Sequence, residues 1–127
     1  MSIVVVARLE AVVLRVRDLD RAIDWYSTTL GLSLAHRDDA TGIAILRLEG
    51  APLTLWRIPD AIAGTMETDR TGNAAFPIFA VRDAEAAHAA LQDAGVTVSP
   101  LHEDLSVRWC EFTDLDGNRL EVCESVA

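Results

Sequence analysis

The sequence predicts an α+β fold made of two tandem βαβββ modules, and three observations support this prediction. The first is an internal repeat, because residues 12–18 (VVLRVRD) resemble residues 77–83 (PIFAVRD) at an offset of 65 residues. The second is that each copy is followed by apolar residues at helical spacing and then by short apolar runs typical of strands. The third is the length of 127 residues, which suffices for one domain with a real core but not for two independent domains.

Each module is predicted to contain one helix, which begins after an aspartate and ends at a glycine. The apolar positions after Asp18 keep helical spacing as far as Gly31, and those after Asp83 keep it as far as Gly95. Aspartate accepts hydrogen bonds from the first backbone N–H groups of a helix, and glycine adopts the left-handed conformation that ends one. Both predicted helices are therefore bounded by residues that favour helix ends.

Three strand-like runs follow each helix, separated by short turn-forming stretches. Residues 59–73, rich in turn formers and charges, separate the modules. We therefore expect one domain over residues 1–127, with module one at about 8–58, the linker at 59–73 and module two at about 74–125. The runs predicted as strands are residues 32–37, 43–48 and 53–58 in the first module, and 96–98, 107–113 and 119–124 in the second.

The chain is acidic, with 11 basic and 20 acidic residues and a formal net charge of −9. This sign disfavours nucleic acid and anionic membranes as partners, because binding to both depends on positive side chains. It favours a cationic small molecule if the negative charge gathers near the ligand.

The first residues and the cysteines favour a cytoplasmic location. The apolar stretch at residues 3–7 is too short for a signal peptide or a membrane span. Cys110 and Cys123 form neither a disulfide framework nor a CxxC motif. Two such cysteines are typical of small buried apolar side chains in a reducing compartment.

Two segments of the chain carry a family resemblance. One is the end of the first predicted helix, which reads DWY at residues 24–26 and LG at 30–31, and the other is the closing FTDLDGNRLEV at residues 112–122. Together with the repeat, they resemble the vicinal oxygen chelate superfamily, which includes glyoxalase I, extradiol dioxygenases, fosfomycin-resistance transferases and bleomycin-resistance proteins. The resemblance implies a curved mixed sheet around a cleft, with the helices on the convex side. It also implies a homodimer, for which residues 3–7 are a candidate exchanged strand.

The same resemblance places metal ligands on the first and last strands of each module, facing the cleft. These positions correspond to Ala11 and Thr54 in the first module and to Phe76 and Glu121 in the second. Only Glu121 is a good ligand, whereas a catalytic divalent ion normally needs about three protein ligands. Moving the alignment by one residue would bring in Glu10, but such a slip turns every side chain of the strand to the other face. We therefore expect no metal and no cofactor.

Strand alternation predicts which side chains share the cleft with these positions. The expected surroundings are apolar, and the indoles of Trp56 and Trp109 are placed to stack on a flat ring. Packing in the core or at a dimer interface is the alternative role of both tryptophans. The predicted ligand-binding residues are Arg15, Thr54, Trp56, Phe76, Ile78, Trp109, Arg119 and Glu121, and Val13, Ala80, Glu111 and Cys123 are expected on the same faces.

Glu121 is also the candidate catalytic residue. A carboxylate in an apolar cleft is suited to act as a general base near neutral pH. The other role open to Glu121 is a structural ion pair with Arg15 or Arg119.

One of the three histidines lies in a segment that borders the predicted cleft. This is His102, whose imidazole can titrate near neutral pH, although we expect a solvated loop there. We expect His36, beside a charged turn, to be exposed and His88, in the second helix, to be structural.

These features favour a metal-independent small-molecule-binding protein of the glyoxalase/bleomycin-resistance type, which sequesters an aromatic or cationic compound. Two enzymatic alternatives stay open. One is a metal-dependent lyase or oxygenase of the glyoxalase or dioxygenase type, with His102 or Glu111 as a substitute ligand beside Glu121. The other is a metal-free isomerase or lyase that uses Glu121 as its base. The sequence therefore leaves open whether the protein is an enzyme.

Overall fold

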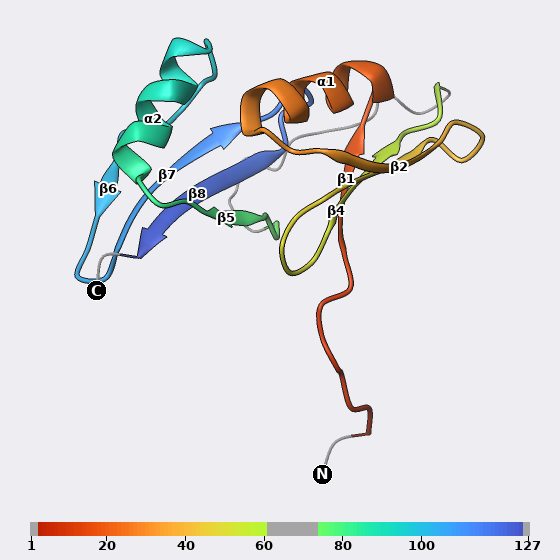
Figure 1. Cartoon of the computed structure of the whole chain (residues 1–127), viewed down its shortest axis with the longest axis horizontal. Helices are drawn as coiled ribbons and strands as arrows, with labels where there is room; N and C mark the ends of the chain where they lie inside the picture. The colour runs from red at the N-terminus through yellow and green to blue at the C-terminus, as the bar shows by residue number, and fades with distance from the viewer. Residues whose placement is uncertain (1–2, 61–73, 126–127) are drawn as a thin grey trace. The chain divides into compact units, whose positions relative to one another are not determined.

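The computed structural model describes residues 3–60 and 74–125, so most of the predicted linker at residues 59–73 lies outside the described residues. The chain divides into two compact units, Met1–Asp60 and Ala61–Ala127. Among the described residues, each unit has one helix and four strands (Figure 1). The predicted α+β fold with two βαβββ modules is therefore confirmed.

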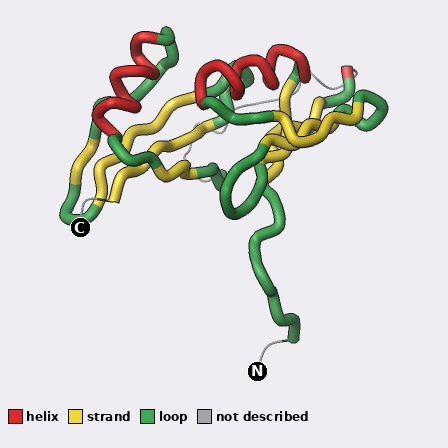
Figure 2. Tube along the Cα trace, in the orientation of Figure 1, coloured by secondary structure: helices red, strands yellow, loops and turns green. Residues whose placement is uncertain are grey.

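The first unit is a four-stranded mixed sheet with a helix against one face (Figure 2). The strand order is β1-β4-β3-β2, in which β1 runs parallel to β4 and the other neighbours are antiparallel. The elements of this unit are β1 (Val12–Val16), α1 (Leu19–Leu30), β2 (Leu34–Asp38), β3 (Ile43–Leu46) and β4 (Leu53–Arg57).

The second unit repeats this topology. Its strand order is β5-β8-β7-β6, with β5 parallel to β8 and antiparallel pairing elsewhere. The sequence repeat is thus a structural repeat. The elements of this unit are β5 (Ile78–Ala80), α2 (Ala84–Asp93), β6 (His102–Glu103), β7 (Val107–Thr113) and β8 (Arg119–Ser125).

One predicted strand, at residues 96–98, is wrong. Only Val98 forms an isolated bridge, with Phe112, and the edge strand of this sheet is instead β6, which begins at His102. The pairing is interrupted between these points because Ser99 bonds to Glu111 through its side-chain oxygen as well as its backbone N–H. Pro100 then follows, and proline has no N–H to continue a ladder.

The predicted helix ends are confirmed. Asp18 accepts a hydrogen bond from the Arg21 backbone N–H (3.1 Å), and Asp83 accepts one from the corresponding group of Ala86 (2.9 Å). Gly31 ends α1 with a left-handed φ of 69°. The helix α2 ends at Asp93 with Ala94 as its C-cap, and Gly95 follows with a left-handed φ of 78°. The helices have 12 and 10 residues, and neither, within the described parts of the chain, is long and apolar enough to cross a membrane.

The helix-facing side of each sheet forms the core of its unit. Leu53 and Leu55 of β4 are 1% and 0% exposed, and Phe112 of β7 and Leu120 of β8 are 2% and 0% exposed. Because side chains alternate along a strand, the residues between these positions lie on the opposite face of the sheet. That opposite face carries the predicted site.

The DLDGN residues of the closing motif, 114–118, form the turn between β7 and β8. Asp114 is buried, and its Oδ1 accepts hydrogen bonds from the backbone N–H groups of Asp116 (2.9 Å) and Asn118 (2.8 Å). Its Oδ2 accepts a third bond from the side-chain amide of Asn118 (2.9 Å). Gly117 has a φ of 83°, a conformation that favours glycine. This network holds the hairpin that carries Glu121.

Asp114→Ala is expected to lower the free energy of unfolding by about 2–3 kcal/mol, because backbone N–H groups in the turn lose a charged acceptor. Leu115→Ala, in the same turn but at a side chain that is 50% exposed, is the control and should change it by less than about 0.5 kcal/mol. Denaturant unfolding followed by tryptophan fluorescence measures both. Equal effects of the two substitutions would contradict this role of Asp114.

Candidate functional site

The exposed face of the first sheet carries the predicted site residues of module one. Registers across β1, β4 and β3 place six side chains in two rows on this face. The predicted alternation is therefore confirmed for this sheet, although a role in binding stays a prediction. The rows are Val13, Thr54 and Ile45, and Arg15, Trp56 and Ile43.

Trp56 is the most prominent side chain of this face, with 42% of the residue exposed. Its indole N–H donates to the carbonyl oxygen of Thr41 (3.2 Å), and the guanidinium carbon of Arg15 lies 4.3 Å from the ring centroid. Arg15 in turn donates from Nε to the carbonyl of Trp56 (3.2 Å). The indole and the guanidinium thus hold each other in place by a cation–π contact.

The exposed face of the second sheet carries the predicted residues of module two. Registers across β5, β8, β7 and β6 again place them together, as alternation predicts. Phe76, just before β5, lies against this group through its ring. The rows are Ile78, Glu121 and Glu111; Ala80, Cys123, Trp109 and His102; and Arg119 and Thr113.

Glu121 is 7% exposed and forms an ion pair with Arg119, at 3.1 Å between Oε1 and Nη2. The same nitrogen lies 2.8 Å from Oε2 of Glu111, and the guanidinium carbon lies 4.1 Å from the centroid of the Phe76 ring. Two carboxylates therefore share one guanidinium, which leaves the group with one negative charge. Of the two partners considered for Glu121, Arg119 is the one that the structure places there.

The expectation of a solvated loop at His102 is wrong. His102 is half-buried in β6, and its ring lies 4.4 Å from the Trp109 ring between centroids, with the planes tilted by 33°. The register pairs the two residues directly across neighbouring strands, a contact that the sequence did not reveal because β6 itself was not predicted. His36 is exposed and His88 bonds to the carbonyl of Ser99 (2.8 Å), as expected of both.

The four family metal positions do not fit a divalent ion. Ala11 and Phe76 have no donor atom, Thr54 offers a neutral hydroxyl, and the carboxylate of Glu121 is already paired. Within residues 3–60 and 74–125, no three His, Cys, Asp or Glu side chains lie close enough together to hold a metal. Glu10 does not repair the site, because it is exposed, lies before β1 and forms an ion pair with Arg8 (2.9 Å).

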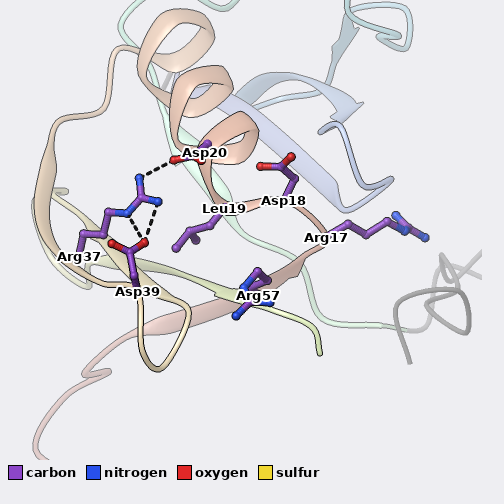
Figure 3. A pocket seen from close by; sticks show the side chains of 7 residues that line it. All are labelled: Arg17, Asp18, Leu19, Asp20, Arg37, Asp39 and Arg57. Carbon is purple, nitrogen blue, oxygen red and sulfur yellow. Dashed lines mark hydrogen bonds and ion pairs between the residues drawn. The ribbon is translucent and has the colours of Figure 1, made fainter. Parts of the chain in front are cut away.

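A cavity of about 350 Å³ lies elsewhere, at the start of α1. Figure 3 shows Arg37 of β2 reaching between Asp20 (2.7 Å) and Asp39 (2.8 Å). Hydrogen bonds to these two carboxylates raise the pKa of Arg37. The charges lining the cavity balance, so we assign it the structural role of tying β2 to α1. It is lined by Arg17, Asp18, Leu19, Asp20, Arg37, Asp39 and Arg57.

The negative charge of the chain is concentrated in the second unit. Residues 1–60 contain seven arginines and eight acidic residues, a net charge of −1. Residues 61–127 contain four arginines and twelve acidic residues, a net charge of −8. The condition set for a cationic ligand, negative charge gathered in one part of the chain, is therefore met in the second unit.

The comparisons with known proteins agree with this architecture. The family description of the Glyoxalase/Bleomycin resistance protein/Dioxygenase superfamily matches residues 8–122. The chain belongs to this superfamily. No functionally curated protein matches it.

Several solved structures have the same fold. A glyoxylase/bleomycin resistance protein/dioxygenase domain from Frankia sp. EAN1pec is 26% identical, with a TM-score of 0.78 over 95% of this chain and 93% of that one. TnmS3, an antibiotic binding protein from Streptomyces sp. CB03234, is 20% identical, with a TM-score of 0.71 over 96% and 98%. TioX from Micromonospora sp. ML1 is 24% identical, with a TM-score of 0.72 over 94% and 100%.

The two cysteines lie on opposite faces of the second sheet. Cys110 is fully buried on the helix side, where burial, with a smaller contribution from the charge of Glu121, raises the pKa of its thiol. Cys123 is half-buried on the exposed face. Because the thiolate is the reactive form, Cys110 should be the less reactive of the two.

We expect iodoacetamide at neutral pH to modify the native protein once per chain, at Cys123. Cys123→Ser should abolish this fast modification, whereas Cys110→Ser should leave it unchanged. Mass spectrometry of intact protein over time measures both rates, and unfolding the chain should expose the second thiol. Fast modification of Cys110 in the native protein would show that the assignment of faces is wrong.

Proposed function

We propose that this protein binds a small aromatic or cationic compound without a metal ion and sequesters it. The observation that carries the proposal is which residues stand at the four positions that bind metal in the family. Three of them lack a suitable ligand, and the fourth, Glu121, is neutralised by Arg119. A chain that keeps the fold but not the ligands retains a binding surface rather than a Lewis-acid centre.

The two exposed sheet faces supply the proposed ligand contacts. Trp56 is held by its indole N–H and by Arg15, so it offers a preorganised stacking surface, and preorganisation lowers the entropic cost of binding. In the second unit, Trp109 and the carboxylates of Glu111 and Glu121 suit an aromatic or cationic group. We also propose that residues 1–127 form a single domain. Thr54, Phe76, Ile78 and Arg119 complete the proposed contacts.

A relative supports this class of function. TnmS3 has the same fold and is an antibiotic binding protein. We extend small-molecule binding, but not its particular ligand, to this chain. We also propose that it acts in the cytoplasm, where its two free cysteines would stay reduced.

We expect the purified, untagged protein to bind no Ni²⁺, Zn²⁺, Co²⁺ or Mn²⁺ stoichiometrically. Calorimetric titration with each ion and elemental analysis of the purified protein measure this. Binding of a flat aromatic compound should quench the tryptophan fluorescence of the same protein. The compound should be recovered unchanged. Tight uptake of one ion per chain would favour the metal-dependent enzyme, and steady conversion of the compound that Glu121→Gln abolishes would favour the metal-free one.

We also propose a homodimer that exchanges the N-terminal segment. Ile3, Val4, Val5 and Val6 are each at least 71% exposed, in a stretch that runs away from the first sheet as an extended chain (Figure 1). Valine and isoleucine favour strands, and β1 is an edge strand with one side open to pairing. Pairing with a second copy would bury these apolar side chains.

Light scattering should therefore give a mass of two chains. Val4→Ser combined with Val6→Ser should weaken the dimer, because it removes apolar area from the exchanged segment. Arg8→Ser combined with Glu10→Ser, which removes an exposed ion pair of 2.9 Å from the same segment, is the matched control. A mass of one chain for the unaltered protein, or equal effects of the two variants, would contradict the exchange.

A further inference from the structure

The carboxylates of Glu111 and Glu121 are direct neighbours across β7 and β8. Like charges directly opposite one another destabilise a sheet, so this pair needs a cation. A single nitrogen, Nη2 of Arg119, lies 2.8 Å from Oε2 of Glu111 and 3.1 Å from Oε1 of Glu121. The guanidinium thus occupies the position between the carboxylates that an exchangeable cation would take.

The rest of the Arg119 side chain is also positioned for this role. Its guanidinium carbon lies 4.1 Å from the centroid of the Phe76 ring, which is a cation–π contact. Phe76 stands at one of the four positions that correspond to metal ligands in the family. Its Nε is buried and has no hydrogen-bond partner among the described residues. An unsatisfied buried donor costs free energy, and neutralising the buried Glu121 offsets that cost.

We propose that Arg119 is a resident cation that takes the electrostatic place of the family's divalent ion, and that Glu111, Glu121 and Phe76 form a cation site selective for planar guanidinium-type groups. The inference rests on the proposed metal-independent function and gives its physical cause. With Arg119 in place, the facing oxygens of Glu111 and Glu121 are already engaged, and the three groups together keep only one negative charge. Without Arg119, two carboxylates still fall short of the three protein ligands that a catalytic ion normally takes.

Selectivity for guanidinium follows from the Phe76 ring. A guanidinium is planar and weakly hydrated, so it stacks on an aromatic face while its N–H groups reach carboxylates. An ammonium ion is a compact, strongly hydrated charge, which gains less from the same surface. A ligand with a guanidinium or amidinium group would therefore occupy this site once the Arg119 side chain is removed.

Chemical rescue tests the proposal. Arg119→Ala should bind one ethylguanidinium ion per chain in calorimetry and gain thermal stability with it, whereas the unaltered protein should do neither. Ethylammonium and sodium chloride are the matched salts. Ethylammonium should bind at least about tenfold more weakly, since its compact, strongly hydrated charge cannot stack on the Phe76 ring as a planar guanidinium does. If Arg119→Ala does not fold, Arg119→Met, which keeps an apolar stem, takes its place in the same titration.

Two control variants isolate the site. Glu111→Gln in the Arg119→Ala background should abolish ethylguanidinium binding, because it removes one of the two carboxylates. Arg82→Ala, which removes an exposed arginine of the same unit, should create no such binding. Absence of uptake by the folded Arg119 variants, or equal uptake after Glu111→Gln, overturns the proposal. Metal titration of the unaltered protein tests the proposed function separately.

Discussion

A strand sends successive side chains to opposite faces of its sheet, and in both units a helix covers one of those faces. The rest of the structure depends on this constraint. Leucines of β4 and β8 fill the helix side, so the residues between them are committed to the other face. Trp56 and Glu121 lie where they do because their neighbours Leu55 and Leu120 are needed in the core.

The two exposed faces have the same topology and different chemistry. On the first, the central pair is an indole and a guanidinium, which attract one another. On the second, the central pair is two carboxylates, which repel one another and require Arg119. The repeated module therefore keeps the scaffold while each copy carries its own side chains, as expected when function resides in sites placed on a common fold.

On the proposal made above, electrostatics limits the capacity of the second face for a metal. A buried carboxylate must be neutralised, and in this chain a covalently attached guanidinium does so. An attached cation is held at high local concentration and does not dissociate, whereas a metal ion must be bound from solution against the cost of its lost freedom. The Asp114 turn contributes by fixing the hairpin on which Glu111, Arg119 and Glu121 lie.

Local patterns were sufficient to predict most of the fold. Helix ends at Asp18 and Gly31 depend on a few neighbouring residues, and the face on which Arg15 or Glu121 lies depends only on a period of two. The failed strand at residues 96–98 and the missed β6 have the same cause. Both depend on how Ser99 bonds to Glu111 from another part of the chain, and nothing local indicates that bond.

The sequence by itself therefore determined the repeat, the α+β class, the sheet faces and the absence of ligands at three of the four family metal positions, because all of these follow from residue type and short-range periodicity. Tertiary structure alone decided that Arg119 of β8 also pairs with Glu111 of β7, and that His102 lies against Trp109. It also decided that Arg37 joins Asp20 to Asp39. Such contacts depend on separations of a few ångströms between atoms of different elements, and periodicity along the chain does not specify these separations.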